Sequence, residues 1–125
     1  IWSGVFLKRA CDALGTRIYN GQPLCEHNKA PRSTFDDLHN EVAGLELNEH
    51  LWELVDDVDP DLPELEAGEP ARYAAVFEAI ATRLADGEFD YRNSDFFGHV
   101  GEHMLDWLEC LDAIAPIEMP APADD

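Results

Sequence analysis

Hydrophobic residues recur at helical spacing near the start of the chain. Five apolar positions within residues 3–15 share one face of a helix: Val5, Phe6, Ala10, Cys11 and Leu14. Gly15 follows directly, and glycine commonly closes a helix in the left-handed conformation. The pattern therefore predicts a helix that ends at about Leu14 and packs with this face inward.

The next stretch of helical periodicity is interrupted at Asn48, so it predicts two helices. The first begins at Thr34, a residue that can cap a helix, with Asp37 near the free amides, and its predicted inner face comprises Phe35, Leu38, Val42 and Leu45. The second, shorter helix begins at Asn48 as its cap and is expected to bury Leu51, Trp52 and Val55. Both helices are expected to turn their apolar faces toward a common core.

Two longer helices are predicted after a proline-containing loop at residues 59–70. Pro70 occupies a favoured first-turn position, Gly87 marks the other end, and the inner face between them comprises Tyr73, Val76, Phe77, Ile80 and Leu84. The last helix is expected to run from a cap at Asn93 or Ser94 to about Ala115. On a helical wheel its core face comprises Phe96, Phe97, Val100, Met104, Trp107, Leu108, Leu111 and Ile114.

These elements predict an all-α fold, a compact bundle of about five helices with short loops. A small hairpin is expected near residues 17–27, around the Asn20-Gly21 turn. We assign residues 1–115 to a single helical domain and residues 116–125 to a flexible, proline-rich acidic tail. No stretch is apolar enough to span a bilayer, so we expect no membrane contact.

The charge of the chain is strongly negative and unevenly distributed. Twenty-seven acids against eight bases give −19, and residues 1–32 hold five of the bases but only two of the acids. Residues 36–69 contain no Lys or Arg and thirteen acids: Asp36, Asp37, Glu41, Glu46, Glu49, Glu53, Asp56, Asp57, Asp59, Asp61, Glu64, Glu66 and Glu69. Such a surface repels nucleic acid and anionic membranes and attracts basic partners. Direct binding to nucleic acid is therefore not expected.

Two interpretations of this acidity stay open. The acids can form a solvated face suited to high salt, which screens charge over about 3 Å at 1 M. Alternatively, the protein docks a basic protein, such as a nuclease or other nucleic-acid-binding protein, in the manner of an immunity protein, an antitoxin or a DNA mimic. We favour this inhibitor-like interpretation, in which the partner-binding residues are Glu49, Trp52, Glu53, Asp56, Asp57, Asp59 and Asp61.

A pair of histidines in the last predicted helix supports the main alternative. His99 and His103 are four residues apart, and histidines at this spacing can bind one metal from a single helical face. The sequence pattern His99-x-x-Glu102-His103 resembles the motif of the inverzincin peptidases. Those zinc enzymes are far larger and use a third ligand well downstream, for which too little chain follows, so we reject the peptidase assignment.

A different zinc site would need ligands from elsewhere in the chain. Cys25 and His27, in the stretch LCEHN, could complete a closed Cys/His set with His99 and His103. The alternative hypothesis is thus a small metal-binding helical protein with hydrolase-like activity. The simpler interpretation is that His99 and His103 lie at the edge of the core and bond to Glu or backbone. We therefore expect no cofactor, with zinc as the alternative.

Other catalytic chemistry finds little support. Asp57, Asp59 and Asp61 occupy the first, third and fifth positions of a calcium loop. However, Leu62 stands where that loop needs glycine, and Gly68 stands where it needs a glutamate. No serine lies in a Gly-x-Ser-x-Gly turn. We therefore expect a binding protein rather than an enzyme, and the three irregularly spaced cysteines favour a reducing compartment, the cytoplasm.

Overall fold

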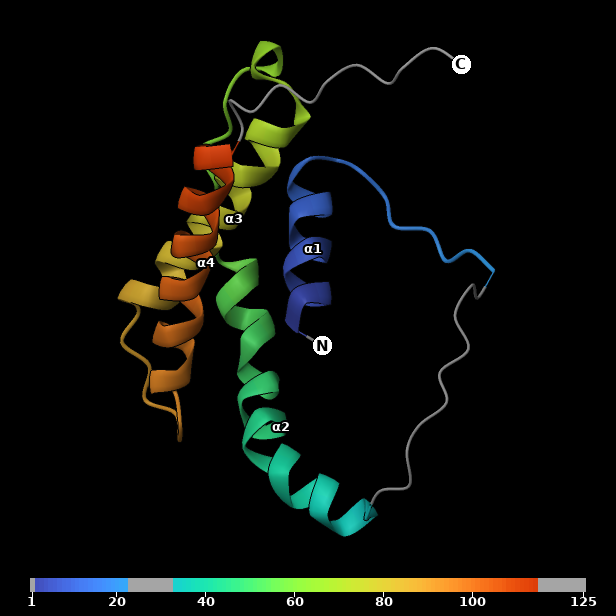
Figure 1. Ribbon diagram of the computed structural model, residues 1–125, viewed down its shortest axis with the longest axis vertical. Coiled ribbons are helices and arrows are strands. Elements are labelled where there is room, and N and C mark those ends of the chain that lie inside the picture. The colour runs from blue at the N-terminus through green and yellow to red at the C-terminus, as the bar shows by residue number, and fades with distance from the viewer. Residues whose placement is uncertain (1, 23–32, 115–125) are drawn as a thin grey trace.

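The computed structural model describes residues 2–22 and 33–114 and is built from helices. In chain order they are α1 (Trp2–Ala13), α2 (Thr34–Asp56), a short 3-10 turn η1 (Leu65–Ala67), α3 (Glu69–Asp86) and α4 (Asp95–Ile114) (Figure 1). No β-strand occurs within those two ranges. The predicted all-α class is confirmed, whereas the predicted number of about five helices is wrong, because the described residues form four α-helices.

Local sequence signals explain where α1 ends. Gly15 adopts the left-handed conformation with φ +68°. This lets the Thr16 backbone N–H donate to Cys11 O at 2.8 Å and the Gly15 N–H donate to Asp12 O at 3.2 Å. The pair of bonds satisfies the last carbonyls of the helix in the manner of a Schellman motif. The predicted glycine stop of α1 is thus confirmed.

The other helix ends follow equally simple chemistry. Ser33, rather than the predicted Thr34, caps α2, since its Oγ accepts the Asp36 backbone N–H at 3.3 Å. Pro70 lies in the first turn of α3 as predicted, where its missing N–H leaves no hydrogen bond unmade, and Gly87 caps the other end. Ser94 directly precedes α4, and it is one of the two residues that were predicted as the cap of this helix.

One continuous helix, α2, replaces the two that were predicted around Asn48. Asn48 lies inside α2, where its Oδ1 is buried and has no hydrogen-bond partner among the described residues. The helix continues because Leu47 and Leu51, on either side, are both buried. Burial of one leucine contributes about 1.5–3 kcal/mol, whereas an asparagine inside a helix costs only about 0.7 kcal/mol. Tertiary burial therefore outweighs the capping preference of Asn48.

The core lies where α1 and the carboxyl half of α2 pack against α3. Helix α3 is central, because it contacts each of α1, α2 and α4. The largest fully buried side chains come from α2, α3 and α4 and comprise Leu51, Val55, Val76, Ile80, Leu84 and Phe97. The described residues include no buried polar or charged residue. The interior is therefore a small, wholly apolar core.

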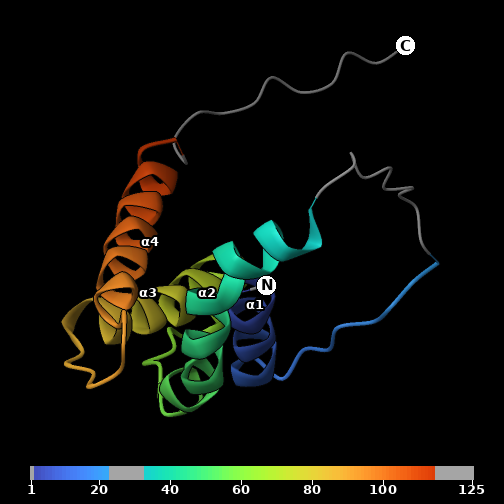
Figure 2. The same cartoon turned by 90° about the horizontal axis from the view of Figure 1, so that it is seen from below.

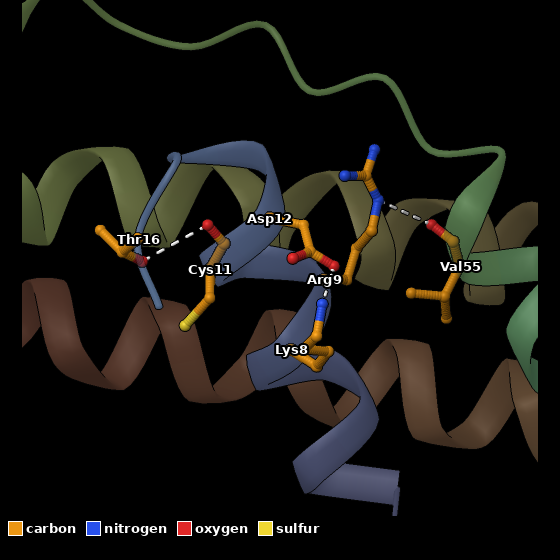
Figure 3. A network of polar contacts seen from close by, with 6 residues as sticks. All are labelled: Lys8, Arg9, Cys11, Asp12, Thr16 and Val55. Atoms are coloured by element: carbon orange, nitrogen blue, oxygen red, sulfur yellow. Dashed lines mark hydrogen bonds and ion pairs between the residues drawn. The ribbon is translucent and has the colours of Figure 1, made fainter. Parts of the chain in front are cut away.

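Arg9 connects α1 to the carboxyl end of α2 (Figure 3). Its Nε donates to Val55 O at 3.1 Å, and its Nη2 donates to Val58 O. Val55 lies in the last turn of α2 and Val58 just beyond it. Free acceptors and the negative end of the helix dipole favour a cation there. On the far side of α1, the Thr16 hydroxyl lies 3.1 Å from the Tyr73 hydroxyl of α3. Both interactions hold α1 in place against the other helices.

The predicted inner face of residues 34–45 is not buried. The amino-terminal half of α2 extends beyond the other helices in both views (Figures 1 and 2). Its four predicted core residues, Phe35, Leu38, Val42 and Leu45, are all exposed. Trp52, also predicted to be buried, is 45% exposed. The prediction is wrong because the buried residues of α2, Leu47, Leu51, Leu54 and Val55, lie on the opposite side of the helix.

The predicted core face of α4 is also wrong in part. Phe97 is buried, but Phe96, Trp107, Leu111 and Ile114 are exposed. The reason is a close contact between backbones: Gly101 is buried against Ala81 and Ala85 of α3. The side of α4 that contacts α3 therefore runs through Phe97 and Gly101. At about 100° per residue, this side is rotated by roughly 70° from the predicted core face.

Two further predictions extend beyond the described residues. Residues 17–22, which include the first half of the predicted hairpin, contain no strand, and residues 23–27 lie outside the described ranges. The predicted tail at residues 116–125 lies outside them as well.

Candidate functional site

Four of the seven predicted partner-binding residues lie on one side of α2. Glu53 lies four positions after Glu49, and Asp56 lies three positions after Glu53. Trp52 lies three positions after Glu49 and four before Asp56, so all four side chains leave the same side of the helix. All four are exposed. This side, which we call the outer face of α2, lies opposite the buried side that packs into the core.

The other three predicted residues follow directly in the chain. Asp57 is the C-cap residue of α2, and its backbone N–H donates to Glu53 O at 3.3 Å. Asp59 and Asp61 lie in the loop that leads to η1. All three are exposed. The structure thus places the seven residues at the carboxyl end of α2 and in the adjoining loop.

The acids of the outer face form no salt bridge in the part of the chain that the structure describes. None of the salt bridges there involves Glu49, Glu53 or Asp56. Glu46, one turn earlier, lies 3.7 Å from Arg92 in an exposed pair that contributes little. Acids near the carboxyl end of a helix face the negative end of its dipole, which costs about 0.3–1 kcal/mol each. Glu53 and Asp56, in the last turn, therefore do not stabilise the helix that carries them.

An apolar stripe continues the outer face toward the amino end of α2. From the sequence, this stripe was expected to face the core rather than the solvent. Phe35, Leu38, Val42 and Leu45 alternate at three and four residues, and the same spacing leads through Glu49 to Trp52. We call the five apolar residues, with Glu49, the outer seam. The spacing was visible in the sequence, but it does not reveal whether such a stripe faces the core or the solvent.

A shallow hollow lies beside Glu49. It has a volume of about 330 Å³ and is lined by Glu46, Glu49, His50, Asp90, Tyr91 and Arg92. The His50 and Tyr91 rings stack in parallel across it, with centroids 3.8 Å apart. The stack joins α2 to the loop before α4, and the lining of this hollow combines two stacked rings with three acids and Arg92.

The two histidines of the metal hypothesis are exposed on α4. His99 Nδ1 lies 3.6 Å from Glu102 Oε2, and His103 Nδ1 lies 3.7 Å from Asp106 Oδ2. Both imidazoles flank the exposed apolar stripe of α4 rather than the core, so the expected position at the core edge is not observed. Both distances are longer than a hydrogen bond, so the expected bonds to Glu or backbone stay a prediction.

The remaining ligands of the predicted zinc set cannot be placed beside these histidines. Cys25 and His27 lie outside the described residues. Within residues 2–22 and 33–114, no three His, Cys, Asp or Glu side chains form a group that could hold a metal ion. The set of Cys25, His27, His99 and His103 therefore stays a prediction.

An open groove runs between the start of α3 and the end of α4. Its volume is about 820 Å³, and its apolar lining includes Pro70, Ala71, Ala74, Leu108, Leu111 and Ile114. Glu78, Glu109 and Asp112 also line it. Like the outer seam, it combines apolar side chains with carboxylates.

Comparisons with known proteins add nothing to this geometry. The chain matches no protein-family model, no curated protein and no solved structure. Among the described residues, no helix has the length and apolar character needed to cross a membrane.

Proposed function

We propose that this protein is a small, non-catalytic acidic protein that docks a basic protein partner through the outer face of α2. The partner class that fits best is a nuclease or another nucleic-acid-binding protein, which offers a basic cleft. The protein would act on it as an immunity protein, an antitoxin or a DNA mimic does. We place this function in the cytoplasm, because the unpaired Cys11 and Cys110 suit a reducing compartment.

The observation that carries the proposal is the exposed grouping of Glu49, Trp52, Glu53 and Asp56 on one helix face. None of the three carboxylates forms a salt bridge within the described residues, so their negative charge is available to a partner. Such a field accelerates association with a basic surface and sets its orientation. The half-exposed Trp52 indole supplies the kind of aromatic side chain that dominates binding energy at interfaces.

The test compares two sets of charge-neutral variants with matched spacing. The first is Glu49→Gln, Glu53→Gln and Asp56→Asn on α2; the second is Glu102→Gln, Asp106→Asn and Glu109→Gln on α4. Both remove three exposed acids at the same intervals, so net charge changes equally. Binding to a synthetic oligo-arginine peptide is measured by calorimetry at low and high salt.

We expect the α2 set to weaken binding by about tenfold or more, and the α4 set by much less, since a local field rather than net charge is recognised. Binding of the unaltered protein should weaken steeply as salt shortens the Debye length from about 10 Å at 0.1 M to about 3 Å at 1 M. Equal losses for the two sets, together with a free energy of unfolding that rises with salt, would instead support adaptation to a salty solvent.

A further inference from the structure

The amino-terminal half of α2 leaves an apolar helix face uncovered. From Ser33 to Glu46 every residue is exposed except Asp37, which is partly buried. This part of α2 extends away from α1, α3 and α4 (Figures 1 and 2). A helix of this length is only marginally stable in water without packing against something. The exposed segment is therefore one that a partner would stabilise.

The exposed apolar residues have the spacing of a coiled-coil seam. The outer seam, from Phe35 to Trp52, follows the alternation of three and four residues that marks heptad positions a and d. Its apolar members keep large exposed fractions: Phe35 83%, Leu38 52%, Val42 42%, Leu45 49% and Trp52 45%. The buried residues of α2, centred on Leu51, lie roughly 160° around the helix at about 100° per residue. Helix α2 thus has two apolar sides, and only one of them faces this protein's core.

The charges beside the seam indicate what kind of helix can cover it. Glu41 flanks it on one side, Glu46 and Glu53 flank it on the other, and Glu49 interrupts it at an a position. Helix α2 contains no Lys or Arg. A second copy of this chain would bring carboxylates against carboxylates, whereas a helix with Lys or Arg at its flanking positions would pair with them. A basic residue opposite Glu49 would also fix the register of the two helices.

We infer that the outer seam of α2 binds a basic amphipathic helix of the partner, by helix–helix packing rather than by charge alone. The inference rests on the proposed function, which it deepens by naming the recognised element. Helix-in-groove and coiled-coil recognition both depend on anchors at such spacing. The acids provide attraction and register, and the seam provides the apolar contact.

The test uses two peptides of identical composition. One has Leu at positions a and d and Lys at e and g over several heptads; the other has the same residues in an order without a seam. Two variants of the full chain add one negative charge each: Leu38→Glu within the seam, and Ala43→Glu, an exposed position on the same helix but off the seam. Circular dichroism verifies that both variants keep the helical content of the unaltered protein.

If the outer seam is the binding surface, the two variants should differ in their affinity for the heptad peptide. Leu38→Glu should weaken binding of the heptad peptide by about tenfold, because it removes a leucine from the contact. Ala43→Glu should leave binding unchanged or strengthen it slightly, because it adds attraction and no obstruction. The peptide without a seam should bind less tightly and should not distinguish Leu38→Glu from Ala43→Glu.

Three other results would overturn the inference, and they are distinguishable. If both peptides bind equally and both variants bind alike, charge alone is recognised, and the proposed function stands without the seam. If neither peptide binds, and oligo-arginine does not bind either, the proposed function fails as well. If sedimentation shows a dimer that Leu38→Glu dissociates, the seam is occupied by a second copy of this chain.

Discussion

The contact at Gly101 makes the sharpest prediction about the stability of this fold. A Cβ atom added at Gly101 would lie 2.5 Å from Ala81 O, 2.5 Å from Ala85 N and 2.9 Å from Ala85 Cα. Non-bonded carbon atoms normally approach to about 3.5–4.0 Å. The obstructing atoms belong to the α3 backbone and cannot swing aside, so Gly101→Ala must move α4 about 1 Å away from α3.

The expected cost follows from two opposing terms. Overpacking of a tight contact costs about 1–3 kcal/mol, and the upper end applies because the obstruction is backbone. Alanine gains about 1 kcal/mol over glycine in helix propensity. The free energy of unfolding should therefore fall by about 2 kcal/mol in Gly101→Ala.

Gly98 provides a matched control in the same helix. The nearest atom to a Cβ there is Ala85 O at 4.0 Å, which is ordinary contact. Gly98→Ala should therefore keep the propensity gain and raise the free energy of unfolding by about 1 kcal/mol. Urea unfolding monitored by circular dichroism measures both variants. If Gly101→Ala were as stable as Gly98→Ala, the close packing of α4 on α3 would be refuted.

Three further variants test the contact between α1 and α2, the core, and the orientation of Leu38. Arg9→Ala should lower the free energy of unfolding by about 2 kcal/mol in the same assay, because Val55 O and Val58 O each lose a charged donor; an unchanged value would show that these bonds add nothing. Leu51→Ala should cost about 2–5 kcal/mol, because Leu51 is fully buried. Leu38→Ala should stay within about 0.5 kcal/mol, and a similar loss for both would contradict the outward orientation of Leu38.

The acidic residues of the candidate site were predicted from the sequence, but the apolar stripe beside them was not predicted to be exposed. The run of acids without Lys or Arg identified Glu49, Glu53 and Asp56, and their common side of α2 follows from helical spacing alone. The apolar continuation through Leu38 and Val42 was assigned to the core, because a heptad stripe looks the same whichever way it faces. Only the position of Leu51 and its neighbours against α3 showed that this stripe faces away from the bundle.

The sequence by itself determined several of the helix ends, because these limits depend on atoms a few residues apart. Gly15 acts through its left-handed backbone and Pro70 through its missing N–H, so both roles could be predicted before any packing was known. Helix continuity at Asn48 and the rotation of α4 depended on tertiary structure instead. The first is decided by burial of Leu47 against distant residues. The second is decided at Gly101, where a missing side chain lets two backbones meet and so determines which apolar residues face water.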